Sequence, residues 1–486
     1  MSLNKQARDF ADIQEIIRQS DIQMIDLKFT DLSGRWRHVT LPARTLDSRV
    51  FTEGIGFDGS SVSSFQRVES GDLCLIPEPA TCFRDPFFER PTLSMMCAIV
   101  DAENRQQFEG DPRFIARKAE AYIQDLGLGI GKALFSPELE FHILDHVAFA
   151  DEPNHSFYFA DSREASWQSG RRDGVNLGAT IPHKSGYHAI QPRDSLSDLR
   201  AEIVMMIQDL GIPVKYHHHE VGAPGQVEIE VLFNSLVHSA DSVMLMKYVI
   251  RNLAHKRGAA VTFMPKPFYG EAGNGMHFHQ FLVGQSGEPI FFDEADPYAQ
   301  LSTMAYAYIA GILDHGRAIC AFTNCSTNSY RRLVPGFEAP TNLFFSLGNR
   351  SAAIRIPKYA TTPDVKRIEF RTPDGCGNIY LNLAAQLMAG IDGVLRRLDP
   401  RTIPGMGPFD VNIGNERAGD LPPIVPVPAS LGEALKALES DQEFLKAGTV
   451  FPAEFIKAWI KGKQLFEIEA VERRPTPFEY RLYFDL

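Results

Sequence analysis

Residues 215–231 read KYHHHEVGAPGQVEIEV, and this stretch restricts the possible fold more than any other. Glu228 and Glu230 alternate with apolar residues, as in a β-strand with one polar face. Residues two apart in a strand point the same way, so these two carboxylates share a side of a sheet. No lysine or arginine lies between Tyr216 and Val231. The fold must therefore hold crowded acceptors whose countercharge comes from elsewhere.

The same alternation recurs in three other segments of the chain. The pairs are Glu138 and Glu140 in SPELEF, His277 and His279 in MHFH, and Glu369 and Arg371 in RIEFR. A solvated sheet face would explain any one pair. Two carboxylates about 5 Å apart, at an effective dielectric near 20, repel by roughly 3 kcal/mol, so several in one cleft require cations. Oxygen ligands with an occasional histidine favour Mg²⁺ or Mn²⁺ over zinc.

The order of elements predicts an α+β fold. A helix is expected at 10–19 and strands at 24–31, 34–42, 73–78 and 93–100, which together make a small β-rich domain. The polar segment 101–113 is the expected linker. Further helices are expected at 112–127, 196–211, 235–258 and 301–322, with strands between them and no regular βαβ repeat. The predicted domains are 1–105 and 106–486.

Composition excludes several classes of protein. The 486 residues carry a net charge of −12 and no dense basic patch, which argues against nucleic acid or an anionic membrane as the main partner. No apolar run is long enough to span a bilayer, and the N-terminal residues lack the apolar core of a secretion signal. Six cysteines form neither a CxxC pair nor a zinc motif. The expected location is the cytoplasm.

Bound magnesium commonly serves phosphate chemistry, yet the chain has no phosphate-binding glycine loop. GLGIG at 127–131 does not match GxGxxG and is interpreted as a helix stop and a turn. A nucleotide would therefore need metals and arginines to hold its phosphates. Arg332, Arg350, Arg355 and Arg371 lie on segments that bracket the acidic strands.

Taken together, the motifs resemble those of type I glutamine synthetases. The blocks, in chain order, are FDGSSV (57–62), SPELEF (136–141), HHHEVGAPGQVE (217–228), MPKPFYGEAGNGMHFH (264–279), RRLVPGFEAP (331–340), NRSAAIRIP (349–357) and RIEFRTPDGCGNIYL (367–381). The resemblance runs from about residue 20 to the closing EYRLYFDL. It implies a small β-grasp-like domain followed by a catalytic domain whose antiparallel sheet forms a metal-lined cleft.

The resemblance also implies roles for individual residues. Glu140, Glu220 and Glu228 would hold one metal ion, and Glu138, His277 and Glu369 a second ion nearer the ATP phosphates. The ammonium pocket would contain Asp58, Ser61, Tyr187 and Glu220, with Asp58 as the base, and Asp72 matches its loop. Glu338 would close over a γ-glutamyl phosphate. Gly273, Arg332, Arg350 and Arg371 would bind substrate, and His279, Arg350 and Arg355 the nucleotide.

Four positions depart from the family pattern. Ala272 stands where an asparagine usually contacts glutamate, Val227 replaces another asparagine, and Phe281 replaces a serine near the nucleotide. Gly414 stands where some bacterial members carry a tyrosine for adenylylation, so control by that modification is not expected. An alanine at 272 loses a hydrogen bond to substrate, worth on the order of 1 kcal/mol.

Three activities remain open at this point. The first is ATP-dependent ligation of ammonia to glutamate, which the surviving Asp58, Ser61 and Tyr187 favour. The second is a γ-glutamylamide ligase that takes methylamine, a polyamine or another amine. The third is an inactive structural relative, against which the complete set of metal ligands argues. The family also implies a homo-oligomer, a dodecamer of two stacked hexamers, in which neighbouring subunits share active sites.

Overall fold

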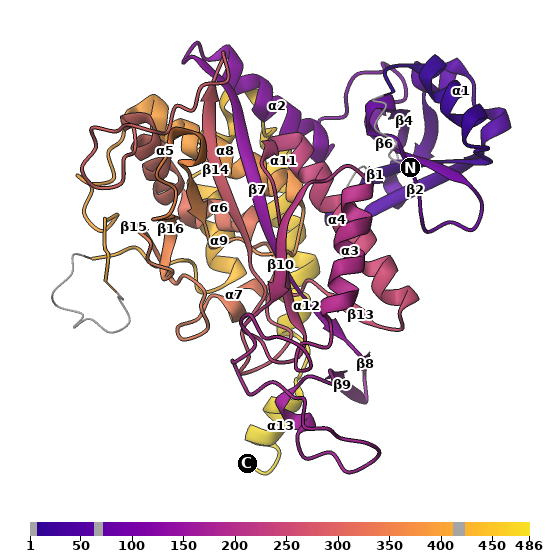
Figure 1. The fold of residues 1–486 in the computed structure, drawn as a ribbon. Coiled ribbons are helices and arrows are strands. Elements are labelled where there is room, and N and C mark those ends of the chain that lie inside the picture. Colours follow the sequence, from indigo (N-terminus) through magenta and orange to yellow (C-terminus); the bar gives the residue numbers. More distant parts are fainter. Residues whose placement is uncertain (1–6, 63–70, 412–422) are drawn as a thin grey trace.

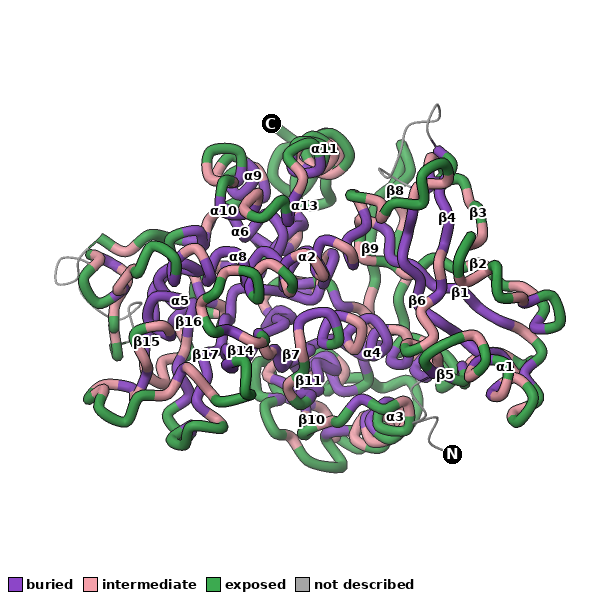
Figure 2. The backbone as a smooth tube through the Cα atoms, turned by 90° about the horizontal axis from the view of Figure 1, so that it is seen from above, coloured by how far each residue is buried: buried purple, intermediate pink, exposed green. Residues whose placement is uncertain are grey.

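The protein contains an N-terminal domain and a larger second domain, each built on its own sheet (Figure 1). The computed structural model describes residues 7–62, 71–411 and 423–486. Each sheet has a separate apolar core, one centred on residues such as Leu27 and Ile99 and the other on residues such as Phe278 and Leu383. Figure 2 shows these buried segments as two purple regions.

The N-terminal sheet has six strands in the order β2-β1-β6-β4-β3, with β5 also paired to β6. The strands are β1 (Met24–Thr30), β2 (Trp36–Pro42), β3 (Ile55–Asp58), β4 (Asp72–Pro77), β5 (Phe83–Arg84) and β6 (Thr92–Asp101). β1 and β6 run parallel, and the other pairs are antiparallel. Helix α1 (Phe10–Gln19) places Ile13 and Ile16 in the core beneath the sheet.

The second sheet has nine strands, in the order β10-β11-β7-β14-β17-β16-β15, with β12 and β13 also paired to β7. Only β15 and β16 pair in parallel among these described strands. The strands are β7 (Ile130–Leu144), β10 (Val214–His219), β11 (Gln226–Val231), β12 (Asn234–Ser235), β13 (Ala260–Thr262), β14 (Met276–Gly284), β15 (Asn342–Leu347), β16 (Ala352–Ile356) and β17 (Ile368–Phe370). A separate hairpin joins β8 (His146–Glu152) to β9 (His155–Asp161).

Helices of the second domain pack against this sheet and on one another, except the last, Pro477–Tyr483, which lies near the C-terminus and buries no residue (Figure 1). They are α2 (Pro112–Asp125), α3 (Ser197–Asp209), α4 (Leu236–Lys256), α5 (Thr303–Asp314), α6 (Gly316–Thr323), α7 (Ser329–Arg332), α8 (Ile379–Arg396), α9 (Leu431–Ser440), α10 (Glu443–Lys446), α11 (Ala453–Lys463), α12 (Glu469–Glu472) and α13 (Pro477–Tyr483). In the parts of the chain that the structure describes, no helix is both long and apolar enough to cross a membrane.

Glycines set the contact between α5 and α8. A Cβ atom at Gly311 would lie 2.1 Å from the carbonyl oxygen of Ala389, and one at Gly393 would lie 2.1 Å from that of Ala307. The two backbones therefore approach closely enough to exclude any side chain at these positions.

The α+β prediction is confirmed, and the N-terminal helix and strands lie where the sequence placed them. The prediction of one helix over 301–322 is wrong, because the chain breaks at His315 into α5 and α6. His315 has non-helical backbone angles (φ −87°, ψ 4°), and its ring lies between Asp392 and Asp441. Tertiary hydrogen bonds thus override a continuous apolar pattern.

Candidate active site

A cavity of about 340 Å³ opens where β7, β11, β14 and β17 meet the loops that follow them. Most of the predicted site residues line it: Glu138, Glu140, Tyr187, Glu220, Glu228, Gly273, His277, Arg332, Glu338, Arg350, Arg355, Glu369 and Arg371. The separate acidic segments of the sequence therefore converge on one cavity.

Strand register brings the acidic residues together. Glu140 on β7 pairs with Glu228 on β11, and Glu138 pairs with His277 on the opposite neighbour, β14. Farther along β14, His279 pairs with Glu369 on β17. Because alternate residues share a face, these pairings place the predicted ligands on the same side of adjacent strands.

The ligand atoms of these residues form three compact groups, in each of which all atoms lie within 4.8 Å of one another. One contains Glu138, His277 and Glu369, as predicted for one metal ion. The second contains His218, Glu220 and Glu228. The third contains Glu138, Glu230 and His279.

Buried carboxyl groups crowd around Glu220 and Glu228. Burial raises the pKa of both carboxyls well above the usual range. Neighbouring carboxylates raise the pKa of each one further, with Glu228 and Glu140 acting on Glu220, and Glu138 and Glu140 acting on Glu228. Glu140 accepts hydrogen bonds from the backbone N–H of Gly275 (2.7 Å) and from Gln226 Nε2 (3.3 Å). No ion pair with a lysine or arginine joins these three carboxylates in the described ranges.

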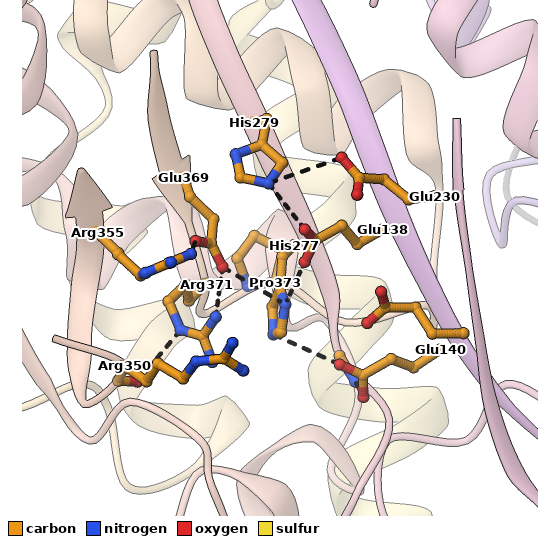
Figure 3. Close-up of polar contacts among 12 residues, drawn as sticks. Glu138, Glu140, Glu230, His277, His279, Arg350, Arg355, Glu369, Arg371 and Pro373 are labelled. Carbon is orange, nitrogen blue, oxygen red and sulfur yellow. Dashed lines mark hydrogen bonds and ion pairs between the residues drawn. The ribbon is translucent and has the colours of Figure 1, made fainter. Parts of the chain in front are cut away.

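Glu369 is in a different electrostatic state, because two arginines hold it (Figure 3). Arg355 Nη1 lies 2.5 Å from its Oε2, and Arg371 Nη1 donates to its Oε1. Burial has the largest single effect and raises the pKa of this carboxyl, but Arg371, His279 and Arg355 together lower it, and the net pKa falls to about 2. Glu369 is therefore ionised at neutral pH.

Glu138 is held by two histidines. His279 Nε2 lies 2.8 Å from its Oε1, and His277 Nδ1 lies 3.0 Å from its Oε2. Burial raises the pKa of Glu138, yet these imidazoles lower it well below the usual range overall.

The donor set fits hard divalent cations. Ionised carboxylates with single imidazoles at close range are the ligands that Mg²⁺ and Mn²⁺ accept. A cation beside Glu140, Glu220 and Glu228 would offset the repulsion that raises the carboxyl pKa values of Glu220 and Glu228.

Arginines line the side of the cavity opposite β11. Arg332 is 2 % exposed, and its guanidinium donates to the carbonyls of Thr372 (2.7 Å), Pro373 and Arg371. Arg350 is more exposed, lies 5.8 Å from the centre of the Tyr187 ring, and accepts a hydrogen bond from Arg371 Nε at its carbonyl. Arg350 is thus the freer of the two to contact a ligand.

Glu338 lies at the mouth of the cavity, on the loop between α7 and β15. Its backbone has φ 60°, a left-handed conformation that costs a non-glycine residue about 1 kcal/mol or more. Lys184 and Lys266 lie over the ring of the preceding Phe337, at 3.9 and 3.6 Å from its centre. Contacts between Phe337 and the two lysines therefore hold the loop next to Glu338.

Gly273 lies where the backbone near Pro265 and the Arg332 side chain approach closely inside the cavity. A Cβ atom there would lie 2.3 Å from the carbonyl oxygen of Pro265 and 3.1 Å from Arg332 Cγ. Ala272 beside it is buried and also lines the cavity.

Asp58, Ser61 and Asp72 lie together in the N-terminal domain, where Asp58 on β3 pairs with Asp72 on β4. Hydrogen bonds from Ser60 and Ser61 hold the pKa of Asp58 at about 2. Asp58 is exposed, and the lining of the catalytic cavity within one chain comes from the second domain. A single chain does not bring this aspartate to the predicted metal ligands.

Three residues of the site were missed by the sequence prediction. His218 joins Glu220 and Glu228, and its alternation with Glu220 in HHHE could have revealed it. Glu230 was recognised as sharing a face with Glu228 but was not assigned as a ligand. Lys215, whose Nζ lies 2.7 Å from Glu230 Oε1, directly precedes the cation-free stretch and gives Glu230 a partner.

The remaining predicted positions lie around the cavity. His279 is fully buried behind it and contacts the site through Glu138. Val227 is buried, and Phe281 packs edge-on against Phe233 with ring centres 4.9 Å apart. Gly414, the position considered for adenylylation, lies outside the described residues.

Comparisons with known proteins cover nearly the whole chain. Profiles described as "Glutamine synthetase, beta-Grasp domain" and "Glutamine synthetase, catalytic domain" match residues 21–102 and 109–483. A glutamine synthetase of Frankia alni is 44% identical over 476 residues, covering 98% of this chain and 99% of the relative. That of Aquifex aeolicus is 45% identical over 475 residues, covering 98% of each. A solved Plasmodium falciparum glutamine synthetase superposes with a TM-score of 0.88 at 28% identity, covering 98% of this chain and 100% of that one.

Proposed function

Because the chain belongs to the glutamine synthetase family, we propose that it ligates ammonia to the γ-carboxylate of L-glutamate at the expense of ATP. The products are glutamine, ADP and phosphate. One observation carries this proposal: carboxylates and imidazoles from separate strands share a single cavity with Arg350, Arg355 and Arg371.

The reaction has two steps. An oxygen of the glutamate γ-carboxylate attacks the γ-phosphorus of ATP, and ADP leaves, giving γ-glutamyl phosphate. The nitrogen of ammonia then attacks the carbonyl carbon, phosphate leaves with its bonding electrons, and a proton passes from the nitrogen to the departing phosphate to give the neutral amide. Asp58 accepts a proton from ammonium before the second step, and Ser61, Asp72, Tyr187 and Glu220 complete the ammonium pocket.

The other cavity residues bind glutamate and the nucleotide and stabilise the phosphoryl group. Gly273, Arg332 and Arg371 bind glutamate, Arg350 stabilises the charge of the transferring phosphoryl group, and Glu338 covers the acyl phosphate. His279, Arg350 and Arg355 contact the nucleotide. Mg²⁺ or Mn²⁺, held by the two ligand sets Glu140, Glu220, Glu228 and Glu138, His277, Glu369, would offset the negative charge on the phosphate oxygens.

Exposed apolar side chains support a homo-oligomer, which we propose to be a dodecamer with shared active sites. Phe484 in the C-terminal segment that follows α13 is 81% exposed and Phe478 on α13 is 61% exposed. Phe149 and Tyr158 on the β8–β9 hairpin are 79% and 67% exposed. Phe149 and Tyr158 lie directly opposite each other on paired strands, and contiguous exposed apolar groups of this kind mark protein interfaces. A neighbouring subunit would also bring an Asp58 to each cavity.

An amine panel tests the activity. With Mg²⁺, ATP and glutamate, we expect phosphate release to depend on ammonium. Full-length similarity to proteins named glutamine synthetase favours ammonia over the alternative of a γ-glutamylamide ligase. Turnover with methylamine or a polyamine, and none with ammonium, would instead establish that alternative.

A further inference from the structure

A second polar cavity, of about 410 Å³, lies between the two domains. Its walls include the loop Ser33–Arg35 between β1 and β2, α4, the segments 261–264 and 325–326, Gly375–Gly377 after β17, and α11 with the helical segment Gln464–Ile468 that follows it. It shares no lining residue with the catalytic cavity among the described residues.

Positive charge dominates this interdomain cavity. Arg35, Lys247, Arg251 and Lys463 line it, together with a single carboxylate, Glu467. That carboxylate is already engaged, since its oxygens accept from Lys463 Nζ (2.9 Å) and from the backbone N–H of Thr327 (2.8 Å).

Lys247 is the buried member of the set, with 6% of its surface exposed. Its Nζ donates to the carbonyl oxygen of Gly375 (2.6 Å), and no carboxylate forms an ion pair with it in the described parts of the chain. Burial, and to a smaller extent the charge of Arg251, lower the pKa of Lys247 to about 8. An ammonium group in this state retains N–H donors for a ligand in the cavity.

The two arginines also lack acidic partners within the described ranges. Arg251 lies over the Phe263 ring, 4.9 Å from its centre, and burial followed by the charge of Arg35 lowers its pKa. The negative charge of Asp374 raises the pKa of Lys247, but this carboxylate already accepts hydrogen bonds from Asn324 Nδ2 (2.9 Å) and from the backbone N–H of Cys376 (3.0 Å). The protein therefore leaves the positive charge of this cavity incompletely compensated.

An apolar pocket of about 630 Å³ adjoins the cavity, and both are lined by Ser33, Trp459, Lys463 and Glu467. Leu32 and Phe466 complete its apolar wall. The combined space has positively charged side chains at one end and aromatic side chains at the other.

We propose that this interdomain cavity binds a small organic polyanion, whose phosphate or carboxylate groups contact Lys247, Arg251 and Arg35. The apolar part of the ligand packs against Trp459. Charge-assisted hydrogen bonds to ammonium and guanidinium groups are strong, and Arg251 offers the planar donors that suit both kinds of anion.

Calorimetric titration of the full chain tests the site, with citrate as the carboxylate probe and AMP as the phosphate probe. We expect at least one probe to bind, and Arg251→Met and Lys247→Met each to weaken it about tenfold or more. Lys256→Met is the matched control on the same helix, since that side chain donates to Pro86 and lines neither cavity. It should bind as the unaltered protein does.

Binding of citrate alone would show that the site prefers carboxylates, and binding of AMP alone that it prefers phosphates. Arg35→Met, at an exposed position, carries the test if Lys247→Met does not fold. Absence of binding by both probes overturns the proposal. So does binding that Arg355→Met abolishes and Arg251→Met leaves unchanged, because the anion would then occupy the catalytic cavity.

Discussion

Single residues of the catalytic cavity differ in where their countercharge comes from. Glu369 is neutralised by Arg355 and Arg371, whereas Glu140, Glu220 and Glu228 are not paired with a lysine or arginine among the described residues. The second set therefore depends most on a bound cation. Removing one of its carboxylates should affect metal binding before it affects the fold.

Glu140→Gln tests this dependence. The amide keeps the size of the side chain but loses the charge, so we expect weaker Mg²⁺ or Mn²⁺ binding and a loss of more than about 100-fold in kcat. Metal titration and phosphate release measure the two effects. Glu202→Gln, which breaks only the exposed pair with Arg257, is the control and should keep both properties. Full activity of Glu140→Gln would contradict the metal assignment.

The variant Asp58→Ala tests whether Asp58 acts as a base or only caps the turn that follows it. Asp58 accepts hydrogen bonds from Ser60 and Ser61, and its pKa of about 2 keeps it ionised at neutral pH. We expect amide formation to fall by about 100-fold or more while ATP affinity stays within about twofold. Asp47→Ala removes a comparable cap, on the N–H of Arg49, and should leave both unchanged. Equal losses of amide formation and ATP binding would make Asp58 structural.

At this scale the sequence predicts which side chains share a strand face better than it predicts their contact partners. Alternation placed Glu138 with Glu140, Glu228 with Glu230, and His277 with His279 on shared faces, because a strand's own period decides which residues share a face. Their assignment to metal ions came from the family resemblance. Alternation did not reveal that Arg355 binds Glu369 or that Lys215 binds Glu230, since those contacts depend on which strands become neighbours. Register between distant strands is a tertiary property.

Among the elements, the junction of α5 and α6 has a pH-sensitive contact. Burial lowers the pKa of His315, but hydrogen bonds to Asp441 (2.8 Å) and Asp392 (2.9 Å) outweigh it, so the net pKa is raised. A raised folded-state pKa stabilises the protein fully below the unfolded value near 6.5. The stabilisation is lost as pH rises through the folded value.

His315→Gln should therefore lower the free energy of unfolding by about 1–2 kcal/mol at pH 6, and by less as the pH increases above 7. Thermal unfolding over a pH series measures the difference. His238→Gln, at a histidine whose ring meets Ser235 on the exposed side of α4, should show little change. A destabilisation that does not vary with pH would assign His315 to packing alone, against Phe444.

The same junction marks where element prediction fails. Residues 301–322 form an apolar helical pattern, yet His315 ends one helix and precedes the next. The partners that fix this break, Asp392 and Asp441, lie far along the chain. Strands such as β4 and β6 were predicted well because their punctuation is local.

For the whole molecule, the separation of Asp58 from the metal ligands has a measurable consequence. If neighbouring subunits share a site, Asp58→Ala and Glu140→Gln chains should restore activity when they assemble together. Some cavities in the mixed oligomer would then combine an intact Asp58 with an intact Glu140. We expect dissociated and reassembled mixtures to recover roughly a quarter of the normal rate if assembly is random. No recovery in confirmed mixed oligomers would place the two residues in one chain's site.

Sequence patterns could not predict how the two domains meet. Gly34 approaches Gly377 so closely that an added Cβ would lie 2.3 Å from the latter's carbonyl oxygen, and Asn378 donates to Asp31 across the boundary. Residues far apart in the chain make this contact, and neither glycine belongs to an alternating pattern. The interdomain cavity depends on it.

The pairing of Glu138 with His277 and of Glu140 with Glu228 also bears on how this sheet tolerates insertion. Adding one residue near the centre of β7 would send every following side chain to the opposite surface, exchanging carboxylates for phenylalanine and leucine. Adding two residues would keep each side chain on its surface but would shift its pairing partner on the neighbouring strand by two residues. The strand at the centre of this sheet therefore has a fixed residue count.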